Sequence, residues 1–223
     1  MVSLYWYPSG GSFGSALIQD HLAYPSVPIV AILNPDSDVG PSYNPVFANA
    51  TAQLQSAGIT VIGYVWTDYG AAPLAQAESN ISLYKSWYHV SGIFFDGMAN
   101  TNSATDEQYY STLTSYARSQ GLQLTIGNPG ASTVAGYVGT VNTINIYENS
   151  GMPSISALTQ ITGYGPSNFS YVSYAVPSLN TSAVNSTLPY VGYLFITNGT
   201  LPNPYQGAPP YFKALLADLA ARG

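Results

Sequence analysis

A strand–helix–strand unit in the middle of the chain decides the fold: TVIGYVW at 60–66, a helical pattern over Leu74–Trp87, and GIFFD at 92–96. Both short segments are apolar along nearly their whole length, whereas a strand with one wet face alternates polar and apolar residues. Strands this apolar, separated by a helix, predict a parallel sheet that is covered by helices.

The same alternation continues in both directions from this unit. The predicted strands are Ser3–Tyr7, Ile29–Asn34, Thr60–Trp66, Ile93–Asp96, Gln123–Gly127, Thr143–Glu148, Tyr171–Val176 and Tyr193–Thr197. The predicted helices are Ser15–Ala23, Pro45–Ala57, Leu74–Trp87, Asp106–Gln120, Thr133–Val138, Ser154–Thr162, Ala183–Pro189 and Tyr211–Ala221. Thr105 is expected to cap the fourth helix, and Gly58 and Gly121 to end the second and fourth.

Eight strand–helix pairs in 223 residues predict an α/β protein with one domain, a compact (β/α)8 TIM-type barrel over residues 1–223. The main competitor is an open doubly wound sheet, which in its dinucleotide-binding form needs a G-x-G-x-x-G turn after the first strand. The glycines between Tyr7 and Gly14 do not have that spacing, and Asn34 stands where the acidic residue is expected.

Composition excludes several classes of function. Charged residues make up 6% of the chain, and four basic residues against ten acidic ones give a net charge of −6. No basic patch for nucleic acid or an anionic membrane can be built from them, and no segment has the length and apolarity of a membrane span. The chain has no cysteine, and its two histidines, His21 and His89, fall outside the predicted mouth, so we expect no metal and no cofactor.

Six N-x-S/T sequons favour a secreted or cell-surface protein, although a cytoplasmic location stays open. The candidate glycosylation sites are Asn49, Asn80, Asn168, Asn180, Asn185 and Asn198. A signal peptide is not expected within this chain, and a monomer is expected.

Catalytic groups of a (β/α)8 barrel lie at the carboxyl ends of its strands, and this rule sorts the charged residues. Three of the four basic residues fall on predicted helices, and Arg222 directly follows the last one, so the mouth is expected to be negative and to take a neutral or cationic substrate. The acidic residues at strand ends or in the loops that follow are Asp36, Asp38, Asp68, Asp96 and Glu148.

Two of these acids, Asp96 and Glu148, each end an apolar strand. Strand alternation places Phe94 on the face of Asp96, and Ile144 and Ile146 on the face of Glu148. An unpartnered charge under the helices is costly, so both carboxylates are expected to point into the mouth. Two acids across a pocket are the minimum for glycoside hydrolysis, while the alternative is that both only accept backbone N–H bonds in loops.

Aromatic and amide side chains gather at the same strand ends, and this set suits a polysaccharide or oligosaccharide. Flat rings stack on sugar faces, while amides, phenols and carboxylates bond to hydroxyl groups. The predicted substrate-binding residues are Tyr5, Tyr7, Asn34, Tyr64, Trp66, Asp68, Tyr69 and Asn128.

An ordered series of motifs along the first two thirds of the chain resembles the spherulation-specific family 4 (spherulin-4-like) proteins. The series is YWYP at 5–8, NP at 34–35, GYVWTDYG at 63–70, GIFFD at 92–96, GNPG at 127–130 and the strand that ends in Glu148. The resemblance implies a (β/α)8 fold and a link to glycoside hydrolase families 135 and 114, which act inside α-1,4-linked galactosamine or N-acetylgalactosamine polymers.

The resemblance also implies roles for the two acids. Asp96 matches the catalytic aspartate of the family, as nucleophile or charge stabiliser, and Glu148 the later glutamate, as general acid/base. Family members commonly carry a glutamate after the aspartate, where this chain has Gly97. The departure leaves two functions open: a hydrolase of shifted specificity, or a carbohydrate-binding or cell-surface protein without catalysis on the same barrel.

Overall fold

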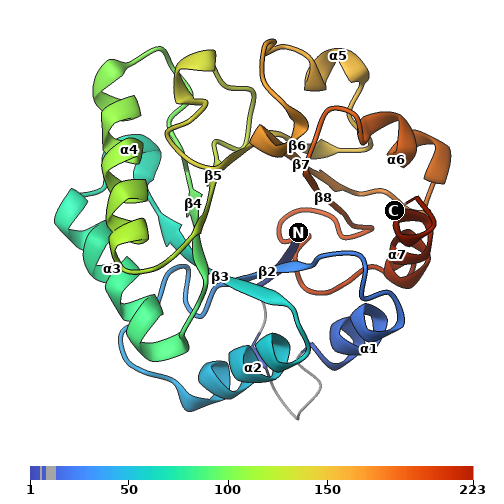
Figure 1. Cartoon of the computed structure of the whole chain (residues 1–223), viewed down its shortest axis with the longest axis horizontal. Helices are drawn as coiled ribbons and strands as arrows, with labels where there is room; N and C mark the ends of the chain where they lie inside the picture. Colours follow the sequence, from blue (N-terminus) through green and yellow to red (C-terminus); the bar gives the residue numbers. More distant parts are fainter. Residues whose placement is uncertain (6, 9–13, 223) are drawn as a thin grey trace.

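Eight parallel strands form one sheet in the order β1 to β8 in a computed structural model that describes residues 1–5, 7–8 and 14–222 (Figure 1). The strands are β1 Val2–Leu4, β2 Val30–Leu33, β3 Thr60–Trp66, β4 Gly92–Asp96, β5 Leu124–Asn128, β6 Thr143–Ser150, β7 Phe169–Tyr174 and β8 Tyr193–Ile196. The prediction of a (β/α)8 barrel is confirmed. The first strand ends at Leu4 rather than Tyr7, and Trp6 lies outside the described residues.

The barrel is nearly closed. Among the described residues the strand ladder runs from β1 to β8, and no β8–β1 pairing completes it. Two bonds cross this seam region: the Met1 amino group donates to the Leu194 carbonyl at 3.0 Å, and the Tyr5 N–H donates to the Tyr205 carbonyl at 3.3 Å. The second bond ties the end of β1 to the connection that follows β8.

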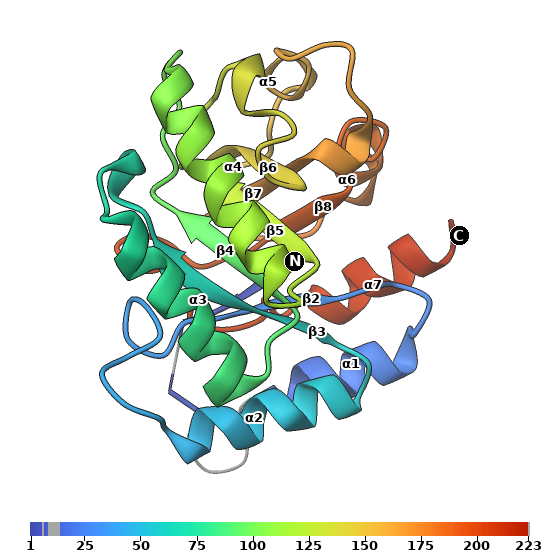
Figure 2. The same ribbon diagram turned by 60° about the vertical axis from the view of Figure 1, so that its left-hand side comes forward.

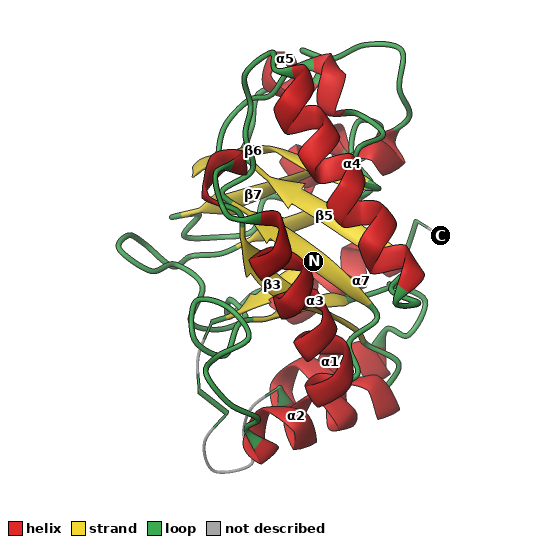
Figure 3. Ribbon diagram, turned by 90° about the vertical axis from the view of Figure 1, so that its left-hand side faces the viewer, coloured by secondary structure: helices red, strands yellow, loops and turns green. Residues whose placement is uncertain are grey.

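The helices surround the strands (Figures 1 and 2). They are α1 Ser15–Ala23, α2 Pro45–Ser56, α3 Leu74–Tyr88, α4 Ala104–Ser119, α5 Ile155–Leu158, α6 Thr181–Thr187 and α7 Phe212–Ala220. Figure 3 shows α1 to α4 as long outer elements and the loops that emerge at the ends of the yellow strands. The carboxyl ends of the strands, together with these loops, carry the side chains of the candidate site.

Two predicted helices are wrong or too long. The segment predicted as a helix over Thr133–Val138 contains only a 3₁₀ turn at Ala135–Tyr137. Gly136 lies so close to Glu107 of α4 that a Cβ at this position would be 2.1 Å from the carboxylate. The segment therefore packs against α4 as a loop. The segment predicted over Ser154–Thr162 is reduced to the single turn α5.

Helix ends follow the expected chemistry, with one correction. The hydroxyl of Ser103, not of Thr105, caps α4, because it accepts the Asp106 N–H at 3.3 Å and the helix already begins at Ala104. Gly58 and Gly121 adopt left-handed conformations after α2 and α4, as predicted (φ 88° and 80°).

Helix-to-sheet packing explains a glycine inside a central strand. A Cβ at Gly63 of β3 would lie 2.5 Å from the ring of Tyr84 on α3, and that tyrosine is fully buried. Only glycine allows the ring to lie flat on the strand at this point. The contact fixes the height of α3 against β3, which supplies several residues of the site.

Candidate active site

Asp96 is the last residue of β4, and its carboxylate accepts hydrogen bonds from both neighbouring strands. The Tyr64 hydroxyl of β3 donates to Oδ2 at 2.8 Å, and Nδ2 of Asn128, the last residue of β5, donates to Oδ1 at 2.7 Å. The ring of Tyr64 also stacks on that of Phe94, with centroids 6.3 Å apart, so Phe94 shares the face of Asp96 as predicted.

Glu148 of β6 faces the same space. Its Oε2 accepts a second hydrogen bond from Nδ2 of Asn128 at 2.7 Å, and its Oε1 accepts the Tyr205 hydroxyl. One amide nitrogen therefore lies between the two acids. Since each carboxylate oxygen is 2.7 Å from that nitrogen, the two oxygens are at most about 5.4 Å apart, twice that distance.

The orientation of Glu148 depends on an irregularity that strand alternation does not predict. The register between β6 and β7 shifts between Asn145 and Tyr147, so that Ile146 is an extra residue. Glu148 consequently shares its face with Asn145, and the prediction that Ile144 and Ile146 accompany it is wrong. Ile146 instead lies beside residues of the α5 segment, including Ala157 and Ile161.

Amide groups behind the acids hold Asn128 in one orientation. Its Oδ1 accepts Nδ2 of Asn145 at 2.8 Å and the Gly130 N–H at 3.1 Å, which leaves both amide hydrogens for the carboxylates. Asn145 is fully buried, and its amide also lies 3.5 Å from Glu148 Oε2. Asn145 was not predicted as a site residue because strict alternation places it on the face opposite Glu148.

Three tyrosine rings pack together next to the acids, and the hydroxyls of two of them, Tyr64 and Tyr205, bond to the carboxylates. The ring of Tyr5 lies edge-on against both Tyr64 and Tyr205, at centroid distances of 5.6 and 5.5 Å. Tyr205 was also missed by the sequence reasoning, because it lies in a proline-rich connection without periodicity in a chain that has 20 tyrosines. Only tertiary contacts bring the Tyr205 hydroxyl to Glu148, so the local sequence contains no pattern that predicts this contact.

Burial controls the electrostatics of this cluster. Burial raises the pKa of both Asp96 and Glu148, and the negative charge of Asp96 raises that of Glu148 further. The hydrogen bonds from Tyr64, Tyr205 and Asn128 act in the opposite direction because they favour the ionised carboxylates. Burial and the nearby carboxylates also raise the pKa of the Tyr64 and Tyr205 hydroxyls, which keeps them protonated as donors.

The remaining predicted binding residues lie around the mouth at different distances from the acids. Trp66, Asp68 and Tyr69 form an exposed cluster at the end of β3. Tyr7 is exposed and packs edge-on against Phe47 of α2. Asn34 follows β2 and is half-buried, and no described contact brings it to Asp96 or Glu148.

A further acidic residue, Asp38 in the loop after β2, is held by bonds to Asn80 and to the backbone. Its Oδ2 accepts Nδ2 of Asn80 on α3 at 2.8 Å, and its Oδ1 accepts the Val39 N–H at 2.8 Å. Burial raises the pKa of Asp38 to about 6, and these bonds oppose the shift. The same contact argues against Asn80 as a glycosylation site, because its side chain is buried and its amide is already bonded.

The other sequons differ in access. Asn168 and Asn185 are half-buried, and their amides donate to the Gly165 carbonyl and to Asp218. The acceptor asparagines that are exposed are Asn49, Asn180 and Asn198.

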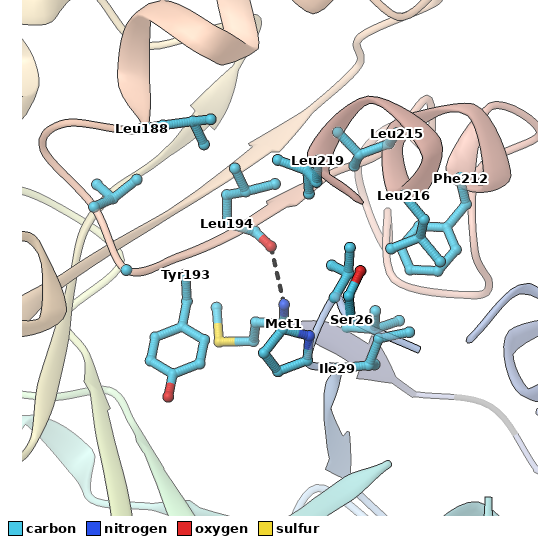
Figure 4. A pocket seen from close by; sticks show the side chains of 15 residues that line it. Met1, Ser26, Ile29, Leu188, Tyr193, Leu194, Phe212, Leu215, Leu216 and Leu219 are labelled. Carbon is cyan, nitrogen blue, oxygen red and sulfur yellow. Dashed lines mark hydrogen bonds between the residues drawn. The ribbon is translucent and has the colours of Figure 1, made fainter. Parts of the chain in front are cut away.

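A hollow of about 250 Å³ at the opposite end of the barrel has a different character (Figure 4). It lies between the amino ends of β1 and β8 and the apolar face of α7, where Phe212 and Leu216 contribute side chains. The Met1–Leu194 bond crosses it. Its lining contains no carboxylate, so it offers none of the acid–base chemistry of the mouth.

No group of three histidine or acidic side chains that could hold a metal ion occurs in the described part of the chain. In the same residues, no helix has both the length and the apolarity to cross a membrane.

The fold and the site define a class: a (β/α)8 barrel with two buried carboxylates close together at the carboxyl ends of its strands. Within that class, the chain belongs to spherulation-specific family 4, whose family model matches residues 1–219. Spherulin-4 of Physarum polycephalum is 30% identical over 217 residues, which are 89% of this chain and 63% of that protein. The chain thus spans less than two thirds of that relative.

Solved structures share the fold. The crystal structure of Aspergillus clavatus Sph3 in complex with GalNAc has a TM-score of 0.89 at 22% identity, covering 98% of this chain and 96% of that one. A glycoside hydrolase family 18 chitinase from Pseudoalteromonas aurantia has a TM-score of 0.62 at 12% identity, covering 98% and 100%. At these identities the likeness concerns the fold.

Proposed function

We propose that this protein is a secreted glycoside hydrolase that cuts inside α-1,4-linked galactosamine or N-acetylgalactosamine polysaccharide. The observation that carries the proposal is the single amide of Asn128 between the carboxylates of Asp96 and Glu148. The sugar is supported by family membership and by the GalNAc bound to Sph3, which shares the fold.

The two acids have different environments, and this difference supports different roles. The two buried charges repel each other, so a state with one acid protonated and the other ionised is favoured. Both acids accept hydrogen bonds on both oxygens, and the Gly97 backbone N–H further favours the ionised form of Asp96. Asp96 is therefore suited to remain ionised and to act on the positive charge that develops at the anomeric carbon. Glu148 is the better candidate to hold the proton and to donate it to the leaving glycosidic oxygen. Glu148 would then take a proton from the water that completes hydrolysis.

The separation of the acids supports retention of anomeric configuration. Retaining enzymes have carboxyl groups about 5–5.5 Å apart, whereas inverting enzymes need about 6.5–9.5 Å to admit a water molecule. The two oxygens that share the Asn128 amide are at most about 5.4 Å apart, which is closer than the separation of inverting enzymes and therefore favours retention. The lack of basic residues at the mouth favours neutral or ammonium-bearing sugars over uronic acids or sulfated sugars.

The test is the release of oligosaccharides from galactosamine polymers of high and low acetylation, analysed by mass spectrometry. We expect products from the wild type and a loss of at least a hundredfold in Asp96→Asn and Glu148→Gln. Asp36→Asn is the matched control, because it removes one exposed carboxylate in the loop after β2. Equal activity in all four proteins would refute the assignment of the two acids.

The alternative is a carbohydrate-binding protein without catalysis, favoured by Gly97 beside Asp96 and by the exposed aromatic rings of Trp66 and Tyr69. Polymer binding that the acid substitutions leave unchanged, without any product, would support it.

A further inference from the structure

The indole of Trp66 lies directly beside Asp96 at the mouth of the barrel. The two residues are Cα partners on the neighbouring parallel strands β3 and β4. Paired residues direct their side chains to the same face, and Tyr64, two residues before Trp66, bonds to Asp96 from that face. Trp66 therefore points to the side of the acids, and 39% of its surface is exposed.

Gly97 makes room for this indole. Its φ of +59° lies in the left-handed region, and a Cβ at this position would lie 2.6–2.7 Å from two carbons of the six-membered ring of Trp66. Real Cβ atoms do not approach other atoms so closely, so any side chain at 97 would displace the ring. The space that a side chain at position 97 would occupy is thus filled by the indole of Trp66.

Tyr69 extends the same surface and is held by the backbone. Its N–H donates to the Gly97 carbonyl at 2.6 Å, and its ring packs edge-on against Trp66 with centroids 5.6 Å apart. Asp68 and Tyr69 both have left-handed backbone conformations, which non-glycine residues adopt at a cost. Such strain persists only where the surroundings enforce it, and it is concentrated at functional sites.

The buried hydroxyl of Thr67 holds the turn at Asp68–Gly70 against the end of β4. Thr67 Oγ1 donates to the Asp96 or Gly97 carbonyl, which lie at 2.8 and 2.9 Å, and is 3.0 Å from the Tyr110 hydroxyl. The Thr67 N–H also donates to the Asp96 carbonyl at 2.9 Å. The exposed rings therefore stand on a rigid support that is shared with Asp96 itself.

We propose that Trp66 and Tyr69 form a stacking subsite for the sugar unit next to the one attacked at Asp96, and that Gly97 is the specificity-determining residue that permits it. The subsite would take the apolar C–H face of a neutral or amino sugar, since exposed rings beside acids and without a cation suit no anionic group. This inference rests on the proposed function and names the residues that select the second sugar unit.

The test measures oligosaccharide binding in a Glu148→Gln background, which prevents turnover. Calorimetry and tryptophan emission are recorded with α-1,4-linked galactosamine and N-acetylgalactosamine oligomers of two to eight units. We expect Trp66→Ala to weaken binding about tenfold and Trp66→Phe to weaken it less. We also expect both to remove the oligomer-dependent change in emission. Tyr164→Ala is the matched control, because this exposed tyrosine lies before β7, at the other end of the barrel.

Gly97→Ala provides a second, independent variant. Its methyl group should push the indole aside and weaken binding as much as Trp66→Ala does, with a native circular dichroism spectrum as the folding criterion. If that variant does not fold, the two Trp66 substitutions decide. Unchanged affinity in both Trp66 variants, while the Glu148→Gln parent binds, would overturn the subsite and leave the proposed function standing. A parent that binds no oligomer, together with an inactive wild type, would overturn the proposed function instead.

Discussion

Removing one hydroxyl, by Tyr205→Phe, isolates the environment of the proposed acid. The Tyr205 hydroxyl donates to Oε1 of Glu148, whose other oxygen is held by Asn128 and, at 3.5 Å, by Asn145. A hydrogen bond to a charged group contributes about 1.5–3 kcal/mol, and about 1.4 kcal/mol corresponds to one pKa unit. Because this bond favours the ionised carboxylate, its loss should raise the pKa of Glu148 by about one unit or more.

The expected result is a shift in the pH profile rather than a loss of the fold. The ring remains, with its contacts to Tyr5 and Phe195, so the mouth should keep its shape. If Glu148 must be protonated to donate, the alkaline limb of kcat/KM should move upward by about one pH unit. The assay is the initial rate of oligosaccharide release from pH 4 to 9, with wild type and variant at matched concentration.

Tyr211→Phe is the matched control for this substitution. Its hydroxyl also lies in the connection after β8 but donates to the Val176 carbonyl at 2.8 Å, away from the acids. Its loss should cost about 1 kcal/mol of stability and leave the pH profile unchanged. An alkaline limb that stays in place in Tyr205→Phe, or moves downward, would refute the role given to Tyr205 and the assignment of Glu148 as the acid.

Four further outcomes follow from the geometry. The Asp38 carboxyl should titrate near pH 6 by NMR, and a titration midpoint below pH 4.5 would contradict this. Because the pKa of Asp38 is raised in the folded state, the free energy of unfolding should fall by roughly 1–2 kcal/mol, relative to Asp38→Asn, as pH rises from about 4 to about 6. Gly63→Ala should lower stability by at least about 1–3 kcal/mol in denaturant unfolding, because its Cβ collides with Tyr84; an unchanged midpoint would show that the helix can move away. NMR of the first product should show retained anomeric configuration, whereas initial inversion would mean that the acids separate when substrate binds. In a glycosylating host, peptide mapping should find glycan at the exposed Asn198 and none at the buried Asn80; modification of Asn80 would indicate that it is reached before folding.

The fold could be predicted from the sequence because the signal is repeated. Each strand of a covered parallel sheet is buried on both faces, which produces short apolar runs separated by helical patterns. Eight repeats leave little choice of architecture, so errors at individual elements, such as the turn at Ala135–Tyr137, do not change the result. The errors fall where packing against a neighbour, as with Gly136 on Glu107, overrides local propensity.

The placement of Asp96 and Glu148 side by side could be predicted for a similar reason, since barrel topology brings the ends of β4 and β6 to the same rim. The shell around them could not. Asn145 faces the acids only because a bulge at Ile146 shifts the register, and alternation within INIYE at 144–148 contains no mark of that bulge. Glu148 was expected to point inward, and it does, but with Asn145 rather than Ile144 as its companion on that face.

The position after Asp96 shows how one substitution depends on another. The family resemblance makes Gly97 a replacement for a carboxylate, which leaves a hydrolase and a binding protein both open. In the structure, the indole of Trp66 covers this glycine. A side chain at 97 and the present position of this indole exclude each other, so the two residues act as one unit. Restoring an acid by Gly97→Glu alone would therefore displace an aromatic surface as well as add a charge. Its effect should be interpreted only beside the same change in a Trp66→Ala background, where the added side chain has room.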